Sequence, residues 1–227
     1  GTARVYGSAD GTGAAASFNN VSGITVDAAG MIYVADKFND TIRKITPAGV
    51  VTTMAGSPGN FGSTNGTGAA ASFAAPLGVA VDGSGNVYVT EDYGYQIRKI
   101  TPAGVVTRLA GNSIGSSDGT SGTFSSPAGI AVDGLGNVYV TDGGTTFIHG
   151  GTIRKITPEG FVTTLAGVPD QIGQIDGTGN AARFNRSEGI AIDPSGNLVV
   201  ADTYNHSIRR VTPVGVVTTF AGGRGSP

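Results

Sequence analysis

The stretch TIRKITPAG at residues 41–49 recurs three more times along the chain, almost unchanged. Its copies are QIRKITPAG at 96–104, TIRKITPEG at 152–160 and SIRRVTPVG at 207–215. The arginines of these copies are therefore 55, 56 and 55 residues apart. Such self-similarity at a nearly fixed period is the signature of a repeat architecture, in which each unit folds in the same way.

Each repeat contains four short runs of β-branched residues, which indicate strands. In the first repeat these runs are residues 23–27, 31–35, 41–46 and 50–55. An Asp-x-x-Gly segment joins the first run to the second, and a Thr-Pro-x-Gly segment joins the third to the fourth. Both segments suit type I turns, because Asp favours the first position, Pro the second and Gly the fourth. Each repeat is therefore expected to form an antiparallel meander of four strands.

Repeated four-stranded meanders can stack radially into a propeller. The first run of every repeat carries a glycine, which suits the crowded innermost position: Gly23, Gly78, Gly129 and Gly189. A solenoid is the competing architecture, but solenoid units are usually shorter and lack the meander. We predict an all-β fold, a β-propeller of four-stranded antiparallel blades with four repeats in this chain and essentially no helix.

The boundaries predict a single propeller domain over residues 1–227, with repeats at about 8–56, 57–111, 112–167 and 168–222. Residues 2–7 are expected to form a partial extra outer strand. Three arrangements stay open at this point. The four blades close a ring by themselves, a second chain completes the ring, or the chain is a segment of a longer array.

The repeats resemble the NHL-repeat family. The resemblance rests on Gly-Ile/Val-x-Val-Asp, Asn-Val-Tyr-Val-x-Asp, Asn-x-x-Ile-Arg-Lys and the closing Thr-x-x-Ala-Gly, and it covers nearly the whole chain. It implies a β-propeller, and propellers of this family commonly close with six blades. Some relatives are enzymes, including a zinc lyase that uses several histidines and lactonase-like or synthase-like propellers.

The composition excludes some classes of function. The 227 residues include no Cys, which rules out disulfides and thiol catalysis, and 14 basic against 16 acidic residues. Because the basic residues other than those of the recurring Ile-Arg-Lys/Arg motif are scattered, a nucleic-acid partner is disfavoured. No apolar run is long enough to cross a membrane, so we expect no membrane insertion. Low charge and loops rich in Gly, Ser, Thr and Asn are compatible with a bacterial secreted protein, and the expected localisation is extracellular or at the cell surface.

Residues that recur in every repeat are interpreted as parts of the blade. The four arginines (Arg43, Arg98, Arg154 and Arg209) are expected to bond carbonyls or carboxylates of a neighbouring blade, because the guanidinium has five donors. The acidic residues that end the second runs are expected to bond local turns: Asp36, Glu91, Asp142 and Asp202. Asp-Gly-Thr-Gly at Asp10 and at Asp176 also favours Asx turns, since neither stretch has the full EF-hand spacing. A catalytic carboxylate pair or a calcium site is the alternative.

Two kinds of connection vary between repeats, and in a meander both emerge at the same end of the blades. From Asp36 to Ile42 the second connection takes 6 positions, but from Asp142 to Ile153 it takes 11. Binding residues are found preferentially on such varied loops. The residues that occur there only once are Lys37, Phe38, Asp92, Tyr93, Tyr95, Phe147, His149, Tyr204 and His206. Six of them, several of them aromatic, are the predicted ligand-binding residues: Tyr93, Tyr95, Phe147, His149, Tyr204 and His206.

We expect a non-catalytic binding or scaffold propeller whose ligand docks at the variable loops, with no cofactor. The expected partner is a protein, a peptide or a glycan, and self-association that completes or extends the ring is a further expectation. The alternatives are a propeller enzyme (a lyase or a lactonase-like hydrolase, with or without a metal) and a structural segment of a longer array. A catalytic zinc site usually has three protein ligands, whereas the chain has only His149 and His206. No catalytic residue is therefore assigned.

Overall fold

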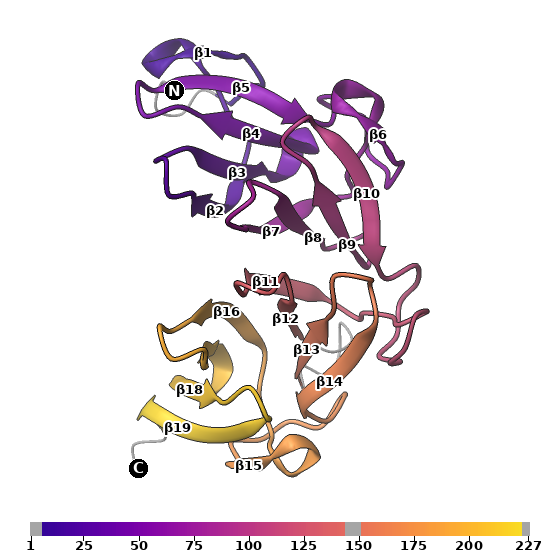
Figure 1. Cartoon of the computed structure of the whole chain (residues 1–227), viewed down its shortest axis with the longest axis vertical. Coiled ribbons are helices and arrows are strands. Elements are labelled where there is room, and N and C mark those ends of the chain that lie inside the picture. Colours follow the sequence, from indigo (N-terminus) through magenta and orange to yellow (C-terminus); the bar gives the residue numbers. More distant parts are fainter. Residues whose placement is uncertain (1–5, 144–150, 224–227) are drawn as a thin grey trace. The chain divides into compact units, whose positions relative to one another are not determined.

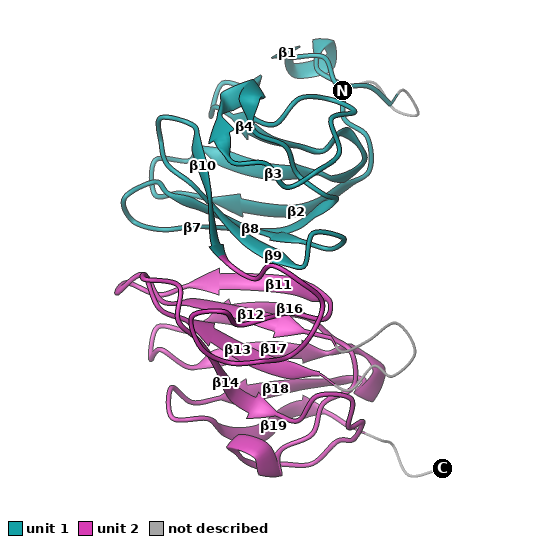
Figure 2. Ribbon diagram, turned by 90° about the vertical axis from the view of Figure 1, so that its right-hand side faces the viewer, with its two compact units in different colours: residues 1–109 teal, residues 110–227 magenta. Residues whose placement is uncertain are grey.

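The computed structural model describes residues 6–143 and 151–223. It is all-β, a four-blade β-propeller with small antiparallel sheets, as the repeats predict (Figure 1). The chain divides into two compact units, Gly1–Leu109 and Ala110–Pro227 (Figure 2). Blades 1 and 2 lie in the first unit, and blades 3 and 4 lie in the second, so each unit contains one joint between consecutive blades.

Each blade is a meander whose consecutive strands pair antiparallel. Blade 1 consists of β2 (Val21–Val26), β3 (Ile32–Asp36), β4 (Thr41–Ile45) and β5 (Val50–Ala55). Blade 2 consists of β7 (Pro76–Val81), β8 (Val87–Glu91), β9 (Gln96–Ile100) and β10 (Val105–Ala110). Blade 3 consists of β11 (Pro127–Val132), β12 (Val138–Asp142), β13 (Thr152–Ile156) and β14 (Val162–Gly167). Blade 4 consists of β16 (Ser187–Ile192), β17 (Leu198–Asp202), β18 (Ser207–Val211) and β19 (Val216–Gly222).

Three blades have a short fifth strand that the sequence analysis treated as loop. These strands are β1 (Gly11–Thr12), β6 (Gly66–Thr67) and β15 (Gly177–Thr178), and each pairs antiparallel with the last strand of its own blade. In blade 3 an isolated bridge between Gly119 and Val162 stands at the same place. The Asp-Gly-Thr-Gly stretches therefore close the outer edge of the sheet.

The helical residues in the described part of the chain form only 3₁₀ turns of three residues: η1 (Gly13–Ala15), η2 (Lys37–Asn39), η3 (Gly68–Ala70), η4 (Gly179–Ala181) and η5 (Thr203–Asn205). Residues 2–5 of the expected extra outer strand lie outside the described residues. Tyr6 forms a parallel bridge with Phe18, and Phe61 forms the same bridge with Phe73. Tyr6 therefore occupies the position that the link between blades takes in the next repeat.

Both predicted turns are present. The N–H of Gly30 donates to the carbonyl of Asp27 at 3.0 Å, and the N–H of Gly49 donates to the carbonyl of Thr46 at 2.8 Å. The two glycines have φ of 78° and 76°. This backbone conformation is sterically unfavourable for residues that have a Cβ. The N–H of Met31, more than any other group, holds the pKa of Asp27 below its usual range. The turn residues thus set the meander locally.

Each unit has a core at the joint between its two blades. In the first unit Phe73 and Val79 of blade 2 pack with Ala35, Ile42 and Ala55 of blade 1. The innermost strands β2 and β7 approach so closely that a Cβ at Gly23 would collide with the carbonyl oxygen of Leu77. This contact explains why the first strand carries a glycine.

Candidate functional site

The repeated arginine lies fully buried in every blade and bonds a fixed set of partners. In blade 1, Nη1 of Arg43 donates to Asp36 Oδ2 at 2.8 Å, and Nη2 donates to Asp10 Oδ1 at 2.8 Å. The guanidinium Cζ lies 5.0 Å from the ring centroid of Phe18. All these partners belong to the arginine's own repeat. The structural role is therefore as expected, but the prediction of neighbouring-blade partners is wrong.

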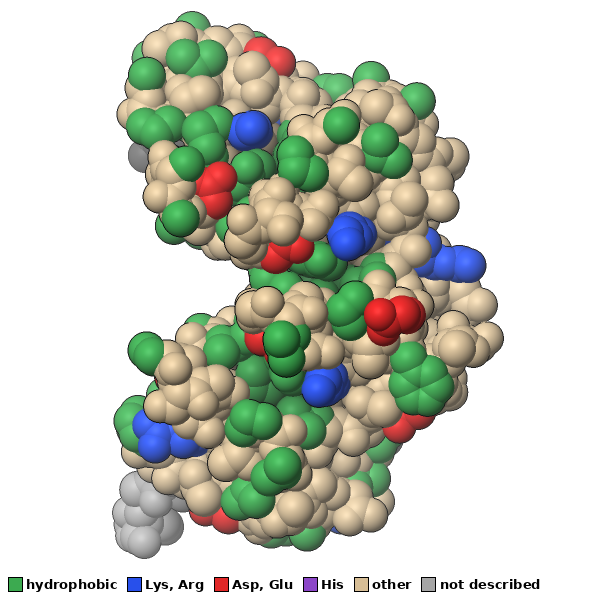
Figure 3. Space-filling view, in the orientation of Figure 1, with side chains coloured by type: hydrophobic (Ala, Val, Ile, Leu, Met, Phe, Trp, Pro, Cys, Tyr) green, Lys and Arg blue, Asp and Glu red, His purple; other side chains and the backbone are tan. Residues whose placement is uncertain are grey.

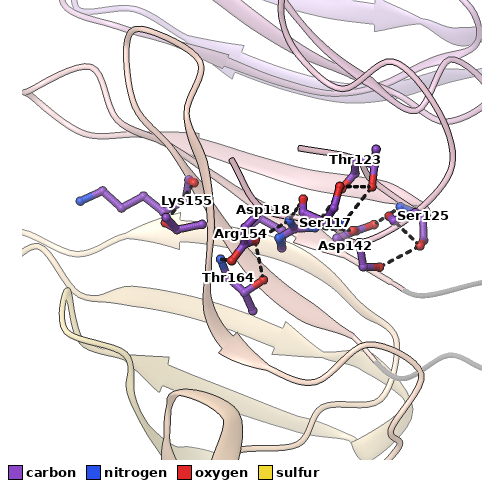
Figure 4. A network of polar contacts seen from close by, with 11 residues as sticks. Ser117, Asp118, Thr123, Ser125, Asp142, Arg154, Lys155 and Thr164 are labelled. Atoms are coloured by element: carbon purple, nitrogen blue, oxygen red, sulfur yellow. Dashed lines mark hydrogen bonds and ion pairs between the residues drawn. The ribbon is translucent and has the colours of Figure 1, made fainter. Parts of the chain in front are cut away.

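Blade 3 repeats this arrangement, and Figure 4 shows Arg154 between its two carboxylates. Arg154 bonds Asp142 Oδ2 at 3.2 Å and Asp118 Oδ1 at 2.8 Å. The hydroxyl of Thr164 also donates to Asp118 Oδ1, at 2.9 Å. Burial raises the pKa of Asp142 to about 6, although N–H groups of the adjacent loop and the Arg154 guanidinium oppose the rise. The acidic residues that the sequence analysis assigned to local turns therefore join a buried ion-pair network.

This network explains the Asp-Gly-Thr-Gly stretches without a cation. Asp10 bonds both Arg43 and, across the fifth strand, the N–H of Thr53 at 3.1 Å. In blade 4, Asp176 accepts hydrogen bonds from Arg209 and from the hydroxyl of Thr219. The Asx-turn interpretation of these stretches is therefore too local. Each carboxylate holds the outer edge of the sheet to the buried arginine.

The predicted ligand-binding residues fall into separate places. Tyr93 and Tyr95 lie on the connection between β8 and β9 in the first unit, whereas Tyr204 and His206 lie between β17 and β18 in the second. Phe147 and His149 lie outside the described residues. Tyr93 is 63% exposed and Tyr204 is 47% exposed. Both side chains are therefore partly exposed to solvent.

Tyr93 is the centre of a cluster on the variable-loop end of the first unit. Its ring centroid lies 6.5 Å from that of Phe61, at an interplanar angle of 50°. The Nζ of Lys37 lies 6.0 Å from the Tyr93 centroid and 3.0 Å from Oδ2 of Asp92. Lys37, Phe61, Asp92 and Tyr93 are called the Tyr93 cluster below. It combines two exposed aromatic rings with an ion pair that is only partly exposed.

Local hydrogen bonds hold the loop that carries Tyr93. The N–H of Tyr93 donates to the carbonyl of Ala74 at 3.4 Å, and that of Asp92 donates to the carbonyl of Ala75 at 3.2 Å. Tyr95 has φ of 51°, and its N–H donates to the carbonyl of Glu91 at 3.1 Å. The exposed ring of Tyr93 is therefore carried by a loop with defined backbone contacts.

Phe61 is the residue of this cluster that the sequence analysis missed. It lies in the link between blades, where the other repeats carry Tyr6, Ile114 and Ile172. Each of these apolar residues is followed by a glycine. That repeated apolar-Gly pair is the signal that could have placed Phe61 beside the connection between β8 and β9.

The second unit holds a different pair at the corresponding loops. The guanidinium of Arg186 lies 5.0 Å from the Tyr204 centroid and donates a hydrogen bond to the Tyr204 hydroxyl. Arg186 also pairs with Glu188 at 3.1 Å. His206 is exposed, with φ of 53°. Tyr204 is thus engaged by an arginine of its own blade.

Charged side chains stand apart from one another on the face shown in Figure 3, among hydrophobic and uncharged side chains. Within residues 6–143 and 151–223, no group of three His, Asp or Glu side chains is arranged to hold a metal ion. No described helix has the length and apolar character that a membrane crossing requires. The link at 111–115 reads Gly-Asn-Ser-Ile-Gly, the letters of a nucleophile elbow, yet the Ser113 hydroxyl donates only to Oδ1 of neighbouring Asn112, at 3.2 Å.

Comparison with known proteins agrees with this architecture. The NHL repeat family model matches residues 184–210. NHL repeat-containing protein 2 of Homo sapiens is 33% identical over 144 residues, which cover 56% of this chain and 20% of that protein. Protein SUPPRESSOR OF QUENCHING 1, chloroplastic, of Arabidopsis thaliana is 30% identical over 129 residues, or 52% of this chain and 12% of that protein. The chain is thus a β-propeller in which residues 184–210 match an NHL repeat.

A solved structure shares the fold at lower identity. It is a catalytically inactive histidine-to-alanine variant of virginiamycin B lyase from Staphylococcus aureus, with quinupristin. The TM-score is 0.61 at 20% identity, and the match covers 88% of this chain and 55% of the lyase chain. This chain thus spans a fifth or less of the two curated relatives and about half of the lyase.

Proposed function

We propose that this chain is a non-catalytic binding propeller that recognises a peptide or a glycan through the Tyr93 cluster. The observation that carries the proposal is the exposure of two aromatic rings, those of Phe61 (59%) and Tyr93 (63%), beside the Lys37–Asp92 ion pair. Aromatic side chains contribute a large contact area while few torsions are ordered. The ion pair adds a donor and an acceptor at a fixed spacing, which suits a ligand with both polar and apolar groups.

The lyase supports a second candidate, a propeller enzyme, because it shares the fold. At 20% identity this similarity carries fold information only. A catalytic role requires a reactive side chain that is available to the substrate, whereas the two charged side chains of the Tyr93 cluster, Lys37 and Asp92, are paired with each other. Binding is therefore the function that the described residues favour.

A thermal-shift screen tests the proposal. The purified chain is heated with peptide and glycan panels and, separately, with divalent metals. We expect a peptide or a glycan to raise Tm, because a ligand that binds only the folded state stabilises it. The Tyr93→Ala and Phe61→Ala variants should lose that rise. Leu135→Ala is the matched control, since Leu135 is an exposed apolar residue on a uniform turn.

Two outcomes contradict the proposal. The first is a screen in which no peptide or glycan raises Tm. The second is a rise that the Tyr93→Ala and Phe61→Ala variants retain in full. A response to a metal alone, accompanied by turnover of a substrate, would favour the enzyme.

A further inference from the structure

Within each unit, one blade covers the first strand of the next. In the first unit, Phe73 and Val79 of blade 2 are 0% and 6% exposed, because they pack against Ile42 and Ala55 of blade 1. The side of a blade that receives its predecessor in this way is called the leading face. The side that covers its successor is called the trailing face.

The leading face of blade 1 is uncovered. Ile24, the equivalent of Val79, is 67% exposed, and Val26 and Val21 on the same strand are 60% and 48% exposed. Phe18 is only partly buried, whereas its equivalent Phe73 is fully buried. The same strand of the same repeat therefore presents an apolar surface in blade 1 that the neighbouring blade buries in blade 2.

The trailing face of blade 4 is open as well. In the second unit, Ile153 and Ala166 of blade 3 are fully buried together with Phe184 of blade 4. Their equivalents in blade 4 are Ile208, which is half-buried, and Ala221, which is exposed. This surface has the same residue types as the trailing face that covers Phe184.

We propose that the trailing face of blade 4 in one copy packs on the leading face of blade 1 in a second copy, head to tail. The joint would place Ile208 and Ala221 against Phe18 and Ile24, as Ile153 and Ala166 stand against Phe184 inside the chain. It repeats a joint that the chain already makes within each unit. An exposed apolar edge strand of this kind marks an interaction surface.

A polar contact of the covered joint has its counterparts at both open faces. In the first unit, the N–H of Ala75 donates to Oδ1 of Asp40 across the joint, at 3.2 Å. The position of Asp40 is taken in blade 4 by His206, and that of Ala75 is taken in blade 1 by Asn20, each with φ between 50° and 60°. A neutral imidazole nitrogen accepts a hydrogen bond as a carboxylate does. His206 can therefore accept a hydrogen bond from the N–H of the second copy's Asn20, as Asp40 accepts one from the N–H of Ala75.

A second copy carries both of the faces that the joint requires. Because the two open faces differ, the contact is heterologous, and it forms a closed two-copy ring or a longer head-to-tail chain.

Sedimentation over a range of concentrations measures the association. The expected mass exceeds that of the 22.5 kDa chain and rises to a two-copy or larger species. Ile24→Asp in the leading face and Ala221→Asp in the trailing face should each weaken association roughly 30-fold or more, the scale of a central interface residue. Leu135→Asp is the matched control, because Leu135 is 83% exposed on a uniform turn, and it should associate as the parent chain does.

Mixing the two variants identifies the geometry. Each variant retains one intact face, so the mixture should form one joint between an Ile24→Asp copy and an Ala221→Asp copy, while each variant alone remains a single copy. Thermal melts check that both variants are folded, and Ile24→Ser replaces Ile24→Asp if the latter unfolds. A single 22.5 kDa species at every concentration would overturn the proposal. Association that survives both substitutions, or a mixture that stays unassociated, would overturn it too.

Discussion

The equivalent buried arginines of blades 1 and 2, Arg43 and Arg98, are bound by different sets of side chains. In blade 1 the carboxylate is that of Asp36, and it accepts a hydrogen bond from Nδ2 of Asn39 at 2.8 Å. In blade 2 the carboxylate is that of Glu91, which is one methylene longer and accepts from the hydroxyl of Ser63 at 2.6 Å. Gly94 replaces the asparagine, and a Cβ at Gly94 would collide with the Glu91 carboxylate. The longer acid and the glycine therefore belong together.

This difference shows how residues that stabilise the blade can be distinguished from residues that are free to contact a ligand. Around the arginine, a change of the acidic residue is accompanied by a compensating change at a neighbouring position. Blade 4 has the same combination as blade 1, with Asp202 as the acid and Asn205 as the asparagine that bonds it. At the variable loops no such compensation is seen. Lys37, Asp92 and Thr203 occupy one position in three blades and share no chemistry. We infer that compensated positions serve the blade and that uncompensated ones are free to serve a ligand.

The largest expected effect comes from removing the arginine of blade 2. Arg98→Met leaves Glu91 buried without its cation, which should lower the free energy of unfolding by about 3–5 kcal/mol. Burial already raises the pKa of Glu91, so its protonated form relieves the variant, and stability should fall as pH rises. Urea unfolding at about pH 5 and about pH 8 measures both trends. A loss under about 1 kcal/mol, or a variant more stable at the higher pH, would contradict this account.

The Glu91–Gly94 pairing should appear as a coupling energy. Gly94→Asn alone is expected to destabilise blade 2, because the new side chain meets the Glu91 carboxylate. Glu91→Asp together with Gly94→Asn recreates the blade 1 arrangement and should recover roughly 1–3 kcal/mol of that loss. A double-mutant cycle by chemical unfolding gives the value. Additive single effects would show that the two positions are independent.

The uniform turns should respond through backbone conformation. Gly136 has φ of 81°, and Gly136→Val should cost roughly 1 kcal/mol or more, because a β-branched residue is strained there. Gly134→Val in the same turn is the control. Its site has no atom within 4 Å of a Cβ, and other repeats carry Ala28 and Pro194 at that position. Equal melting temperatures for both variants would argue against the assigned turn.

Acid should weaken the same turns. The pKa of Asp27 is lowered from 3.8, chiefly by the N–H of Met31, so its carboxylate stabilises the fold above that value. This contribution is lost as pH falls through the lowered pKa of the folded state. Thermal melts from about pH 6 to about pH 3 should show a falling Tm, with a shallower fall for Asp27→Asn. An identical slope in the parent chain and the variant would remove this turn from the acid response.

The smallest effect on stability is expected at the Tyr93 cluster. Tyr93 is exposed, so Tyr93→Ala should change the free energy of unfolding by no more than about 0.5 kcal/mol. Urea unfolding next to Arg98→Met makes the comparison direct. A loss above about 1 kcal/mol would assign Tyr93 to the blade rather than to a ligand.

The fold could be predicted from sequence where the signals are local. The Asp27–Gly30 turn depends on four neighbouring residues, and its conformation is as the sequence indicates. The partners of Arg43 could not be found in this way. Asp10 reaches it only because β1 joins the outer edge of the sheet, and the pairing of a two-residue strand leaves almost no sequence pattern.

The members of the Tyr93 cluster could be found from the sequence only in part. Tyr93 is exposed as expected, but Phe61 comes to its side from a link 32 residues earlier in the chain. Tyr95 and His206 are unique as side chains, yet both have the positive φ that Asp40 has at the same point of blade 1. Their backbone therefore follows the blade, and uniqueness of residue type overstated how distinctive these two positions are.

Amide hydrogen exchange with and without a ligand from the thermal-shift screen tests the central claim most directly. It reports, segment by segment, where the backbone gains protection on binding. The account predicts slower exchange in residues 58–63 and 91–96, which carry Phe61 and Tyr93, and unchanged exchange in the turns at 101–104 and 133–136. Protection confined to those turns, with none at 58–63 or 91–96, would contradict it.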